Sequence, residues 1–210
     1  MGKFLKIKVC GLSEAQNISD IAYLKPDMMG FIFYEKSERY AGILSNFKLL
    51  KNIPKNIQKA GVFVNSQASE ITKICNNYSL DIIQLHGNES PETCKQLTEG
   101  RIVIKAFSVS NKFDFNSCKE YENCCDYFLF DTKGEKYGGN SIKYNWDILK
   151  KYKGKTRFFL SGGLGPEDID DIKSLNHGQL VGVDINSRFE TEPGMKDVSL
   201  VKKFITRIRE

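Results

Sequence analysis

Two apolar, strand-like runs of the sequence each end in a group that can exchange a proton. The first run, residues 6–9, leads into the thiol of Cys10, and the second leads into the carboxyl group of Asp131. A thiolate can remove a proton from a substrate, and a protonated carboxyl group can supply one. The two side chains therefore predict an acid–base site in which the thiol and the carboxyl group point into the same pocket.

Six further runs of apolar, β-branched or aromatic residues complete a regular series. The eight runs end near Cys10, Phe33, Val64, His86, Phe107, Asp131, Gly162 and Ile185. Successive ends are roughly 21 to 31 residues apart, which leaves room for one helix and two loops in each interval. The series predicts an α/β fold made of a single (β/α)8 barrel, the TIM barrel, whose active sites lie at the carboxyl ends of the strands.

Helix signals lie between the strand runs. Ser13 is expected to cap a helix that begins at residue 14, and Ser90 is expected to cap one that begins at Pro91. Gly154 is expected to end a helix after a lysine-rich turn. Two further helices are each expected to pack one face against the strands. The residues on that face are Ile71, Ile74, Cys75 and Tyr78 in one helix, and Val198, Val201, Lys202 and Ile205 in the other.

Length and composition favour one domain that spans residues 1–210. With 210 residues and 40% hydrophobic side chains, the chain can bury a core but leaves short loops for a barrel. No long apolar stretch or signal peptide is present, so we expect a soluble, cytoplasmic protein with no membrane partner. The net charge of +5 is dispersed among acidic residues, which argues against a nucleic-acid partner. A monomer is the default expectation, and a homodimer stays open.

The cysteines do not have the spacing of a metal site. The sequence has six, with no CxxC pair and only two histidines, at Cys10, Cys75, Cys94, Cys118, Cys124 and Cys125. We therefore expect no metal and interpret most of these thiols as core residues. Cys10 differs because it ends the first strand. No nucleotide cofactor is expected either, because Gly11 does not begin a GxGxxG motif and no P-loop lysine pattern is present.

The loops after the seventh and eighth strands have features of a phosphate site. Gly162 and Gly163 follow the seventh strand, and Asn186 with Ser187 follows the eighth. Paired glycines allow backbone N–H groups to approach a phosphate closely, and TIM barrels often bind phosphate at these two loops. A tight turn without a ligand is the structural alternative for the two glycines.

Eight segments in order along the chain resemble one family, the phosphoribosylanthranilate isomerases of tryptophan biosynthesis. The segments are KVCGL at 8–12, GFIFYEKSERY at 30–40, GVFVN at 61–65, QLHG at 84–87, DTK at 131–133, YGG at 137–139, SGGL at 161–164 and ETEPGMKD at 190–197. The resemblance implies an aldose–ketose isomerase that converts a small phosphosugar, N-(5-phosphoribosyl)anthranilate, to 1-(2-carboxyphenylamino)-1-deoxyribulose 5-phosphate by an Amadori rearrangement. It implies no cofactor.

The same resemblance implies roles for individual residues. Asp131 is the general acid that protonates the ring oxygen, and Cys10 is the general base that removes the proton from C2. Arg39 holds the carboxylate of the anthranilate ring, and we expect it across the barrel from the loops after strands seven and eight. The remaining residues expected to bind substrate are Gln84, His86, Gly162, Gly163, Asp184, Asn186, Ser187 and Arg188. A structural role for His86 is an open alternative.

Two short segments depart from the family pattern. Asn186, Ser187 and Arg188 stand where the family usually has two serines and a glycine, and Asn140 with Ser141 replaces Thr or Ser followed by Gly. Arg188 removes the freedom of a glycine while adding a cation for phosphate. The alternatives that stay open are a related phosphosugar lyase of the indole-glycerol-phosphate synthase type and a catalytically silent, phosphate-binding barrel.

Overall fold

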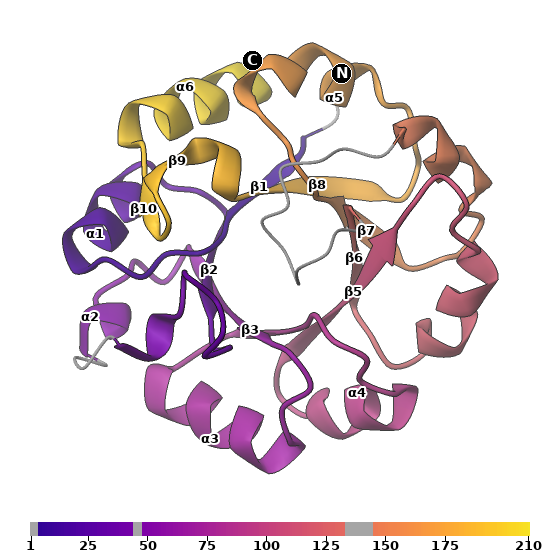
Figure 1. Ribbon diagram of the computed structural model, residues 1–210, viewed down its shortest axis with the longest axis horizontal. Coiled ribbons are helices and arrows are strands. Elements are labelled where there is room, and N and C mark those ends of the chain that lie inside the picture. Colours follow the sequence, from indigo (N-terminus) through magenta and orange to yellow (C-terminus); the bar gives the residue numbers. More distant parts are fainter. Residues whose placement is uncertain (1–3, 44–47, 133–144) are drawn as a thin grey trace.

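Eight parallel strands close into a barrel in the computed structural model, which describes residues 4–43, 48–132 and 145–210. The strands are β1 (Lys6–Val9), β2 (Met28–Ile32), β3 (Gln58–Phe63), β4 (Ile82–Leu85), β5 (Ile102–Val109), β6 (Tyr127–Thr132), β7 (Arg157–Leu160) and β8 (Leu180–Ile185). They are hydrogen-bonded in sequence order, and β1 pairs with β8 to close the ring (Figure 1). The prediction of a TIM barrel is confirmed.

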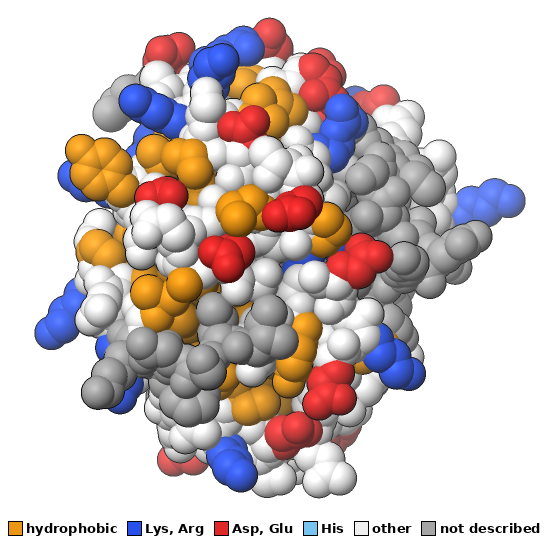
Figure 2. Space-filling model, turned by 60° about the vertical axis from the view of Figure 1, so that its left-hand side comes forward, with side chains coloured by type: hydrophobic (Ala, Val, Ile, Leu, Met, Phe, Trp, Pro, Cys, Tyr) orange, Lys and Arg blue, Asp and Glu red, His pale blue; other side chains and the backbone are white. Residues whose placement is uncertain are grey.

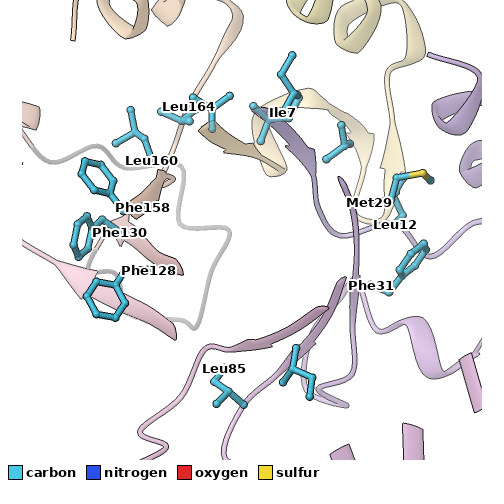
Figure 3. Close-up of a cluster of buried hydrophobic side chains, with 14 of the residues drawn as sticks. Ile7, Leu12, Met29, Phe31, Leu85, Phe128, Phe130, Phe158, Leu160 and Leu164 are labelled. Atoms are coloured by element: carbon cyan, nitrogen blue, oxygen red, sulfur yellow. The ribbon is translucent and has the colours of Figure 1, made fainter. Parts of the chain in front are cut away.

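Successive side chains of each strand point alternately into the barrel and toward the helices. The inward layer includes Met28, Ala60, Ile82, Ile104, Ala106, Leu129 and Phe159, which pack together in the interior. Their outward neighbours, among them Ile7, Met29, Phe31, Leu85, Phe128, Phe130 and Phe158, form the core between barrel and helices (Figure 3). Residues two apart on a strand share a face. On each strand, the side chains that follow this inward apolar layer at steps of two therefore also point into the barrel, as far as the carboxyl end of the strand.

The barrel is surrounded by helices of uneven length. The α-helices are α1 (Ala15–Tyr23), α2 (Lys48–Lys51), α3 (Ala68–Tyr78), α4 (Pro91–Leu97), α5 (Ile169–Ser174) and α6 (Val198–Arg209). The short 3-10 helices are η1 (Ala41–Ile43), η2 (Phe115–Tyr121), η3 (Trp146–Lys151), η4 (Pro166–Asp168) and η5 (Ser187–Phe189). Within the described residues, the connections that follow β5 and β6 carry the 3-10 helices η2 and η3 where an α-helix was expected.

The helix signals of the sequence were partly right. Ser90 accepts a hydrogen bond from the Thr93 N–H and α4 begins at Pro91, as predicted. Ser13 does not cap α1, because the cap position is Glu14. Gly154 does not end η3, which has Tyr152 at that position. The face predicted for α3 is buried except for the partly exposed Ile74, whereas Lys202 of α6 points outward and Phe204 takes a place in the core.

A small antiparallel hairpin, which the sequence did not predict, follows β8. It consists of β9 (Glu190–Glu192) and β10 (Met195–Lys196) and packs beside α1 (Figure 1). The Asn17 side chain of α1 binds the backbone of Lys196 twice, through its N–H and its carbonyl oxygen, at 2.8 Å each. This clamp fixes Glu190 and Lys196 relative to the barrel mouth.

The charges on the surface and the length of the helices bear on possible partners. On the face in Figure 2, acidic and basic side chains are interspersed, with no single field of one sign. Of the helices that the structure describes, none is both long and apolar enough to cross a membrane. The segments 133 and 137–141, which contain part of the family resemblance and the Asn140 and Ser141 departure, lie outside the described residues.

Candidate active site

A pocket lies at the carboxyl ends of the barrel strands. The residues that line it are Cys10, Ile32, Tyr34, Val62, Val64, Gln84, His86, Asp131, Thr132, Ser161, Gly162, Gly163, Leu164, Asp184, Asn186 and Ser187. Of the site residues expected from the sequence, Arg39 and Arg188 are the two that do not line the pocket.

Cys10 lies directly after β1, where its N–H donates to the carbonyl of Ile185 on β8 at 2.9 Å. Its side chain has room because the facing residue on β2 is Gly30, where a Cβ atom would come within 2.7 Å of the Cys10 Sγ atom. Burial raises the pKa of the Cys10 thiol, and the Lys8 ammonium group acts in the opposite direction. Desolvation therefore favours the protonated thiol, and the nearby cation favours the thiolate.

Lys8, which is fully buried, forms an ion pair with Asp184, which lines the pocket near Cys10. The Lys8 Nζ atom donates to both carboxylate oxygens of Asp184, at 3.0 and 2.9 Å. Burial alone would lower the pKa of Lys8, but Asp184 and Cys10 outweigh it and raise that pKa, so Lys8 stays charged. The sequence contained the signal for this arrangement, because Lys8 is two residues before Cys10 on the same strand and must share its face.

Asp131 has two hydrogen-bond partners in the pocket. The backbone N–H of Thr132 donates to its Oδ1 atom at 3.0 Å, and the His86 Nε2 atom lies 3.1 Å from its Oδ2 atom. The other ring nitrogen of His86, Nδ1, is 3.0 Å from the Gln84 Nε2 atom. Gln84, His86 and Asp131 thus form one chain of polar contacts across the ends of β4 and β6.

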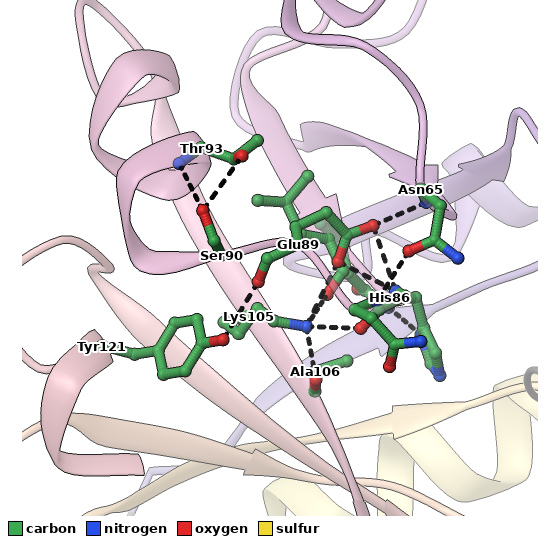
Figure 4. A network of polar contacts seen from close by, with 12 residues as sticks. Asn65, His86, Glu89, Ser90, Thr93, Lys105, Ala106 and Tyr121 are labelled. Carbon is green, nitrogen blue, oxygen red and sulfur yellow. Dashed lines mark hydrogen bonds and ion pairs between the residues drawn. The ribbon is translucent and has the colours of Figure 1, made fainter. Parts of the chain in front are cut away.

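A second network lies behind β4 and supports the loop that carries His86 (Figure 4). Glu89 accepts hydrogen bonds from the N–H groups of Asn65 at 2.8 Å and Gly87 at 3.0 Å. Lys105, whose side chain leaves the outer face of β5, donates to Glu89 at 3.2 Å and to the carbonyl of Gly87 at 2.8 Å. Both side chains are almost fully buried. The network fixes the backbone on either side of His86.

The loops after β7 and β8 meet on one side of the pocket, as expected for a phosphate site. Gly162 and Gly163 have φ angles of +94° and +64°, which favour glycine. A Cβ atom on Gly162 would also lie 2.1 Å from the Thr132 side-chain oxygen, so the close approach of the loop to β6 needs a glycine. Across from them, the Asn186 Oδ1 atom accepts from the Lys196 Nζ atom at 2.7 Å.

Arg39 lies beside the loop after β8, and the prediction that it is across the barrel from this loop is wrong. Its guanidinium group binds the Glu190 carboxylate through Nε at 2.9 Å and through a terminal nitrogen at 2.7 Å. A Cβ atom on Gly11 would contact both Arg39 and Asn186, which shows how near the two side chains are. The reason is closure: β2 is separated from β8 by β1 alone.

Glu190 and Lys196 link Arg39 to the phosphate side. Burial would raise the pKa of Glu190, but Arg39 and Lys196 outweigh it and lower that pKa, so the carboxylate is ionised. Burial lowers the pKa of Lys196 to about 8. The sequence prediction did not assign either residue to the site, although both lie in the segment at 190–197 that carries part of the family resemblance. Arg188, by contrast, pairs with Glu167 at 2.8 Å on the surface.

A (β/α)8 barrel with a thiol, a carboxyl group and a glycine turn around one pocket is an enzyme of the acid–base class that acts on small phosphorylated substrates. A family model described as N-(5'-phosphoribosyl)anthranilate (PRA) isomerase matches residues 7–207. The chain therefore belongs to the N-(5'-phosphoribosyl)anthranilate isomerase family. This membership confirms the resemblance found in the sequence.

Individual relatives agree over nearly their whole lengths. The isomerase of Parabacteroides distasonis is 45% identical over 204 residues, covering 96% of this chain and 92% of that protein. The crystal structure of the Thermotoga maritima enzyme superposes with a TM-score of 0.88 at 32% identity, covering 98% of each chain. A second isomerase structure, in complex with reduced 1-(o-carboxyphenylamino)-1-deoxyribulose 5-phosphate, matches with a TM-score of 0.84 at 30% identity, again over 98% of each chain.

Proposed function

We propose that this protein isomerises N-(5-phosphoribosyl)anthranilate by an Amadori rearrangement, with Asp131 as general acid and Cys10 as general base. The observation that carries the proposal is that both groups line one pocket together with the glycine turn of Gly162 and Gly163. The ligand of the related structure has a phosphate at one end and an aromatic carboxylate at the other. A pocket for such a molecule needs one site for the phosphate, one for the aromatic carboxylate, and groups that transfer protons.

Asp131 begins the reaction by giving a proton to the furanose ring oxygen, which opens the ring to a cationic imine. In the arrangement described above, Gln84 donates through Nε2, so His86 accepts at Nδ1 and donates from Nε2 to Asp131. That tautomer matches an ionised Asp131. When the carboxyl group carries its proton, His86 accepts at Nε2 and needs a hydrogen-bond acceptor for its Nδ1–H.

Gln84 can supply that acceptor by turning its amide over. Its Oε1 atom is buried and has no hydrogen-bond partner among the residues that the structure describes. Rotation of the amide by half a turn would place this oxygen against Nδ1 of His86. The amide of Gln84 thus allows His86 to form a hydrogen bond with Asp131 in either protonation state. A general acid needs this because it loses and regains its proton in each turnover.

Cys10 then removes the proton from C2 of the sugar. The cationic imine makes this C–H bond acidic, and the resulting enolamine becomes the ketone by proton transfer. The charged Lys8 favours the thiolate, and its own partner Asp184 keeps it in place below the thiol. The phosphate is proposed to bind Gly162, Gly163, Asn186 and Ser187, with the aromatic carboxylate directed to Arg39.

The direct test follows the loss of phosphoribosylanthranilate fluorescence in the presence of purified protein and no added cofactor. Asp131→Asn and Cys10→Ser retain the shape of each side chain but remove the acid and weaken the base. Each should reduce kcat by about 100- to 10,000-fold. Cys75→Ser, a buried cysteine of α3 outside the pocket, is the matched control and should retain kcat. A wild-type protein without turnover would refute the activity, and near-normal kcat in either variant would refute that role.

A further inference from the structure

Two adjacent cysteines and a third from an earlier helix come together on the outer side of the barrel. Cys94 lies on α4, and Cys124 and Cys125 lie in the turn between η2 and β6. The three sulfur atoms all lie within 4.8 Å of one another. None of these residues lines the pocket that contains Cys10 and Asp131. The reaction described above makes no use of this cluster.

The spacing of the sulfur atoms fits a metal ion that prefers sulfur ligands. Zinc–thiolate bonds are about 2.3 Å long, so sulfurs around one ion are about 3.8 to 4.0 Å apart in tetrahedral or trigonal geometry. Small side-chain rotations can contract a triangle with sides of at most 4.8 Å to that size. We propose that Cys94, Cys124 and Cys125 bind one thiophilic ion, Zn²⁺ or Cu⁺, as three thiolates.

The surroundings allow both access and coordination. Cys94 and Cys124 are buried, whereas Cys125 is partly exposed, so an ion can reach the cluster from solvent. Cu⁺ can be satisfied by three thiolates, and Zn²⁺ would add a water molecule on the open side. Glu89 lies nearby, but its carboxylate is already bound by Asn65, Gly87 and Lys105, so it is not a further ligand.

The charges near the cluster are compatible with such a complex. Three thiolates with Zn²⁺ carry one net negative charge, and three with Cu⁺ carry two. The Lys105 ammonium group is close enough to interact electrostatically with the Cys94 sulfur. On binding, each thiol releases its proton to solvent, and Cys124 gives up its S–H contact with the Tyr121 carbonyl at 3.4 Å.

An ion at this position would connect two elements that support the active site. Cys94 is on the helix that follows β4 and the His86 loop, and Cys125 is two residues before β6, which ends with Asp131 and Thr132. Because the ion binds the folded arrangement of three thiols, it stabilises the folded state. Thermal stability should therefore rise when the site is filled, while Cys10 and Asp131 keep their own contacts.

The test uses the full chain, reduced and freed of metal. Cd²⁺ serves as a spectroscopic probe, because cadmium thiolates have a charge-transfer band in the ultraviolet, and competition with chromogenic chelators then measures Zn²⁺ and Cu⁺ separately. We expect one ion per chain and a rise in Tm. Cys94→Ser or Cys125→Ser should weaken binding by at least about 100-fold, the upper range for the loss of a group that merely supports a ligand. Cys75→Ser and Cys118→Ser, two buried cysteines outside the cluster, should bind as the wild type does.

Cys125→Ser is the second variant because this partly exposed position tolerates a hydroxyl even if the buried Cys94→Ser chain folds poorly. Circular dichroism establishes which variants are folded. The proposal is overturned if the reduced wild-type protein shows no thiolate band, or if the folded Cys125→Ser protein binds as tightly as the wild type. Loss of the band in Cys10→Ser would also overturn it, because the ion would then belong to the catalytic pocket. Tighter competition by one of the two metals identifies the ion.

Discussion

Cys10 is subject to two opposing influences in this site. Its burial raises the pKa of the thiol, and the charged Lys8 beneath it lowers that pKa. Lys8 in turn keeps its charge because it donates to both oxygens of Asp184. The proposed base is therefore controlled by a residue that does not line the pocket, which makes Lys8 a positioning residue with an electrostatic effect.

Replacing Lys8 by Met should move the pH dependence of kcat/KM to higher pH. A base acts when deprotonated, and loss of the nearby cation raises the pKa of Cys10, so the rising limb of the profile shifts upward. Lys8→Met with Asp184→Asn avoids an unpaired buried carboxylate and should show the same direction of shift. Lys6→Met, on the same strand and further from the thiol, is the control. An unchanged limb in the folded double variant would contradict the role of Lys8.

Arg39 should distinguish ligands that carry the aromatic carboxylate from those that lack it. Glu190 binds one edge of the Arg39 guanidinium group. A guanidinium group has five N–H donors, so it can bind a second carboxylate as well. Arg39→Ala should reduce binding of the reduced product analogue by about 1.5–3 kcal/mol, roughly ten- to over a hundredfold. Arg39→Lys should restore only part of this, because an ammonium group cannot make a two-pronged contact.

The measurement is titration calorimetry with the reduced product analogue and with the same compound lacking its carboxylate. Arg188→Ala is the comparison, because Arg188 pairs with Glu167 on the surface and should not discriminate between the two ligands. If Arg39→Ala weakens both ligands by the same factor, Arg39 does not bind the carboxylate.

At the scale of elements, the segment from β4 to α4 depends on an ion pair outside the barrel. Lys105 and Glu89 together bind the backbone at Gly87 and Asn65, and the Ser90 hydroxyl caps the helix that follows (Figure 4). Within this short stretch, the chain must turn so that His86 faces Asp131. We therefore expect the buried pair to support the proposed reaction by holding the backbone of this turn.

Lys105→Met should destabilise the protein by about 3–5 kcal/mol, because it leaves the buried Glu89 carboxylate without its cation. The double variant Lys105→Met with Glu89→Gln should recover part of that loss. Urea unfolding measures both values. Lys150→Met removes one member of an exposed pair on η3 and should change stability by less than about 1 kcal/mol. Equal losses in Lys105→Met and Lys150→Met would contradict the structural role of the buried pair.

The sequence predicted elements that depend on local patterns better than it predicted contacts. All eight strands were recognisable, because buried parallel strands are apolar along their length, and Ser90 before Pro91 was recognisable as a helix start. The 3-10 helices after β5 and β6 were not recognisable, because the spacing of their apolar residues also suits a short α-helix. The partners of Arg39 and Lys8 lie 151 and 176 residues away, and such contacts depend on the closure of the barrel.

At the scale of the whole molecule, the pocket is built from loops contributed by strands all round the barrel. Cys10, His86, Asp131 and the Gly162 turn come from β1, β4, β6 and β7, and none of these strands can form its part of the site alone. A ligand that contacts several loops should therefore stabilise the entire fold. Calorimetry tests the prediction that residues 1–210 form one domain.

Inorganic phosphate should raise the Tm of the protein while a single unfolding transition is retained. Binding at one site stabilises the folded state by about 2.7 kcal/mol when the free ligand is at 100 times its Kd. Differential scanning calorimetry at matched ionic strength, with chloride as the control anion, separates this effect from screening. Gly163→Ala, at a φ angle of +64°, should reduce the effect by distorting the turn. Equal effects of chloride and phosphate would contradict the phosphate site, and two separate transitions would contradict the single domain.

The pairing of β1 with β8 has a consequence for how the protein is made. Lys8 and Asp184 are separated by 176 residues, which a ribosome adds in about 9–35 s at about 5–20 residues per second. During that time the nascent chain has Cys10 and Lys8 but neither the β8 edge that pairs with β1 nor the carboxylate that neutralises Lys8. We therefore expect the contacts around the proposed base to form late in synthesis, once nearly all of the barrel has left the exit tunnel.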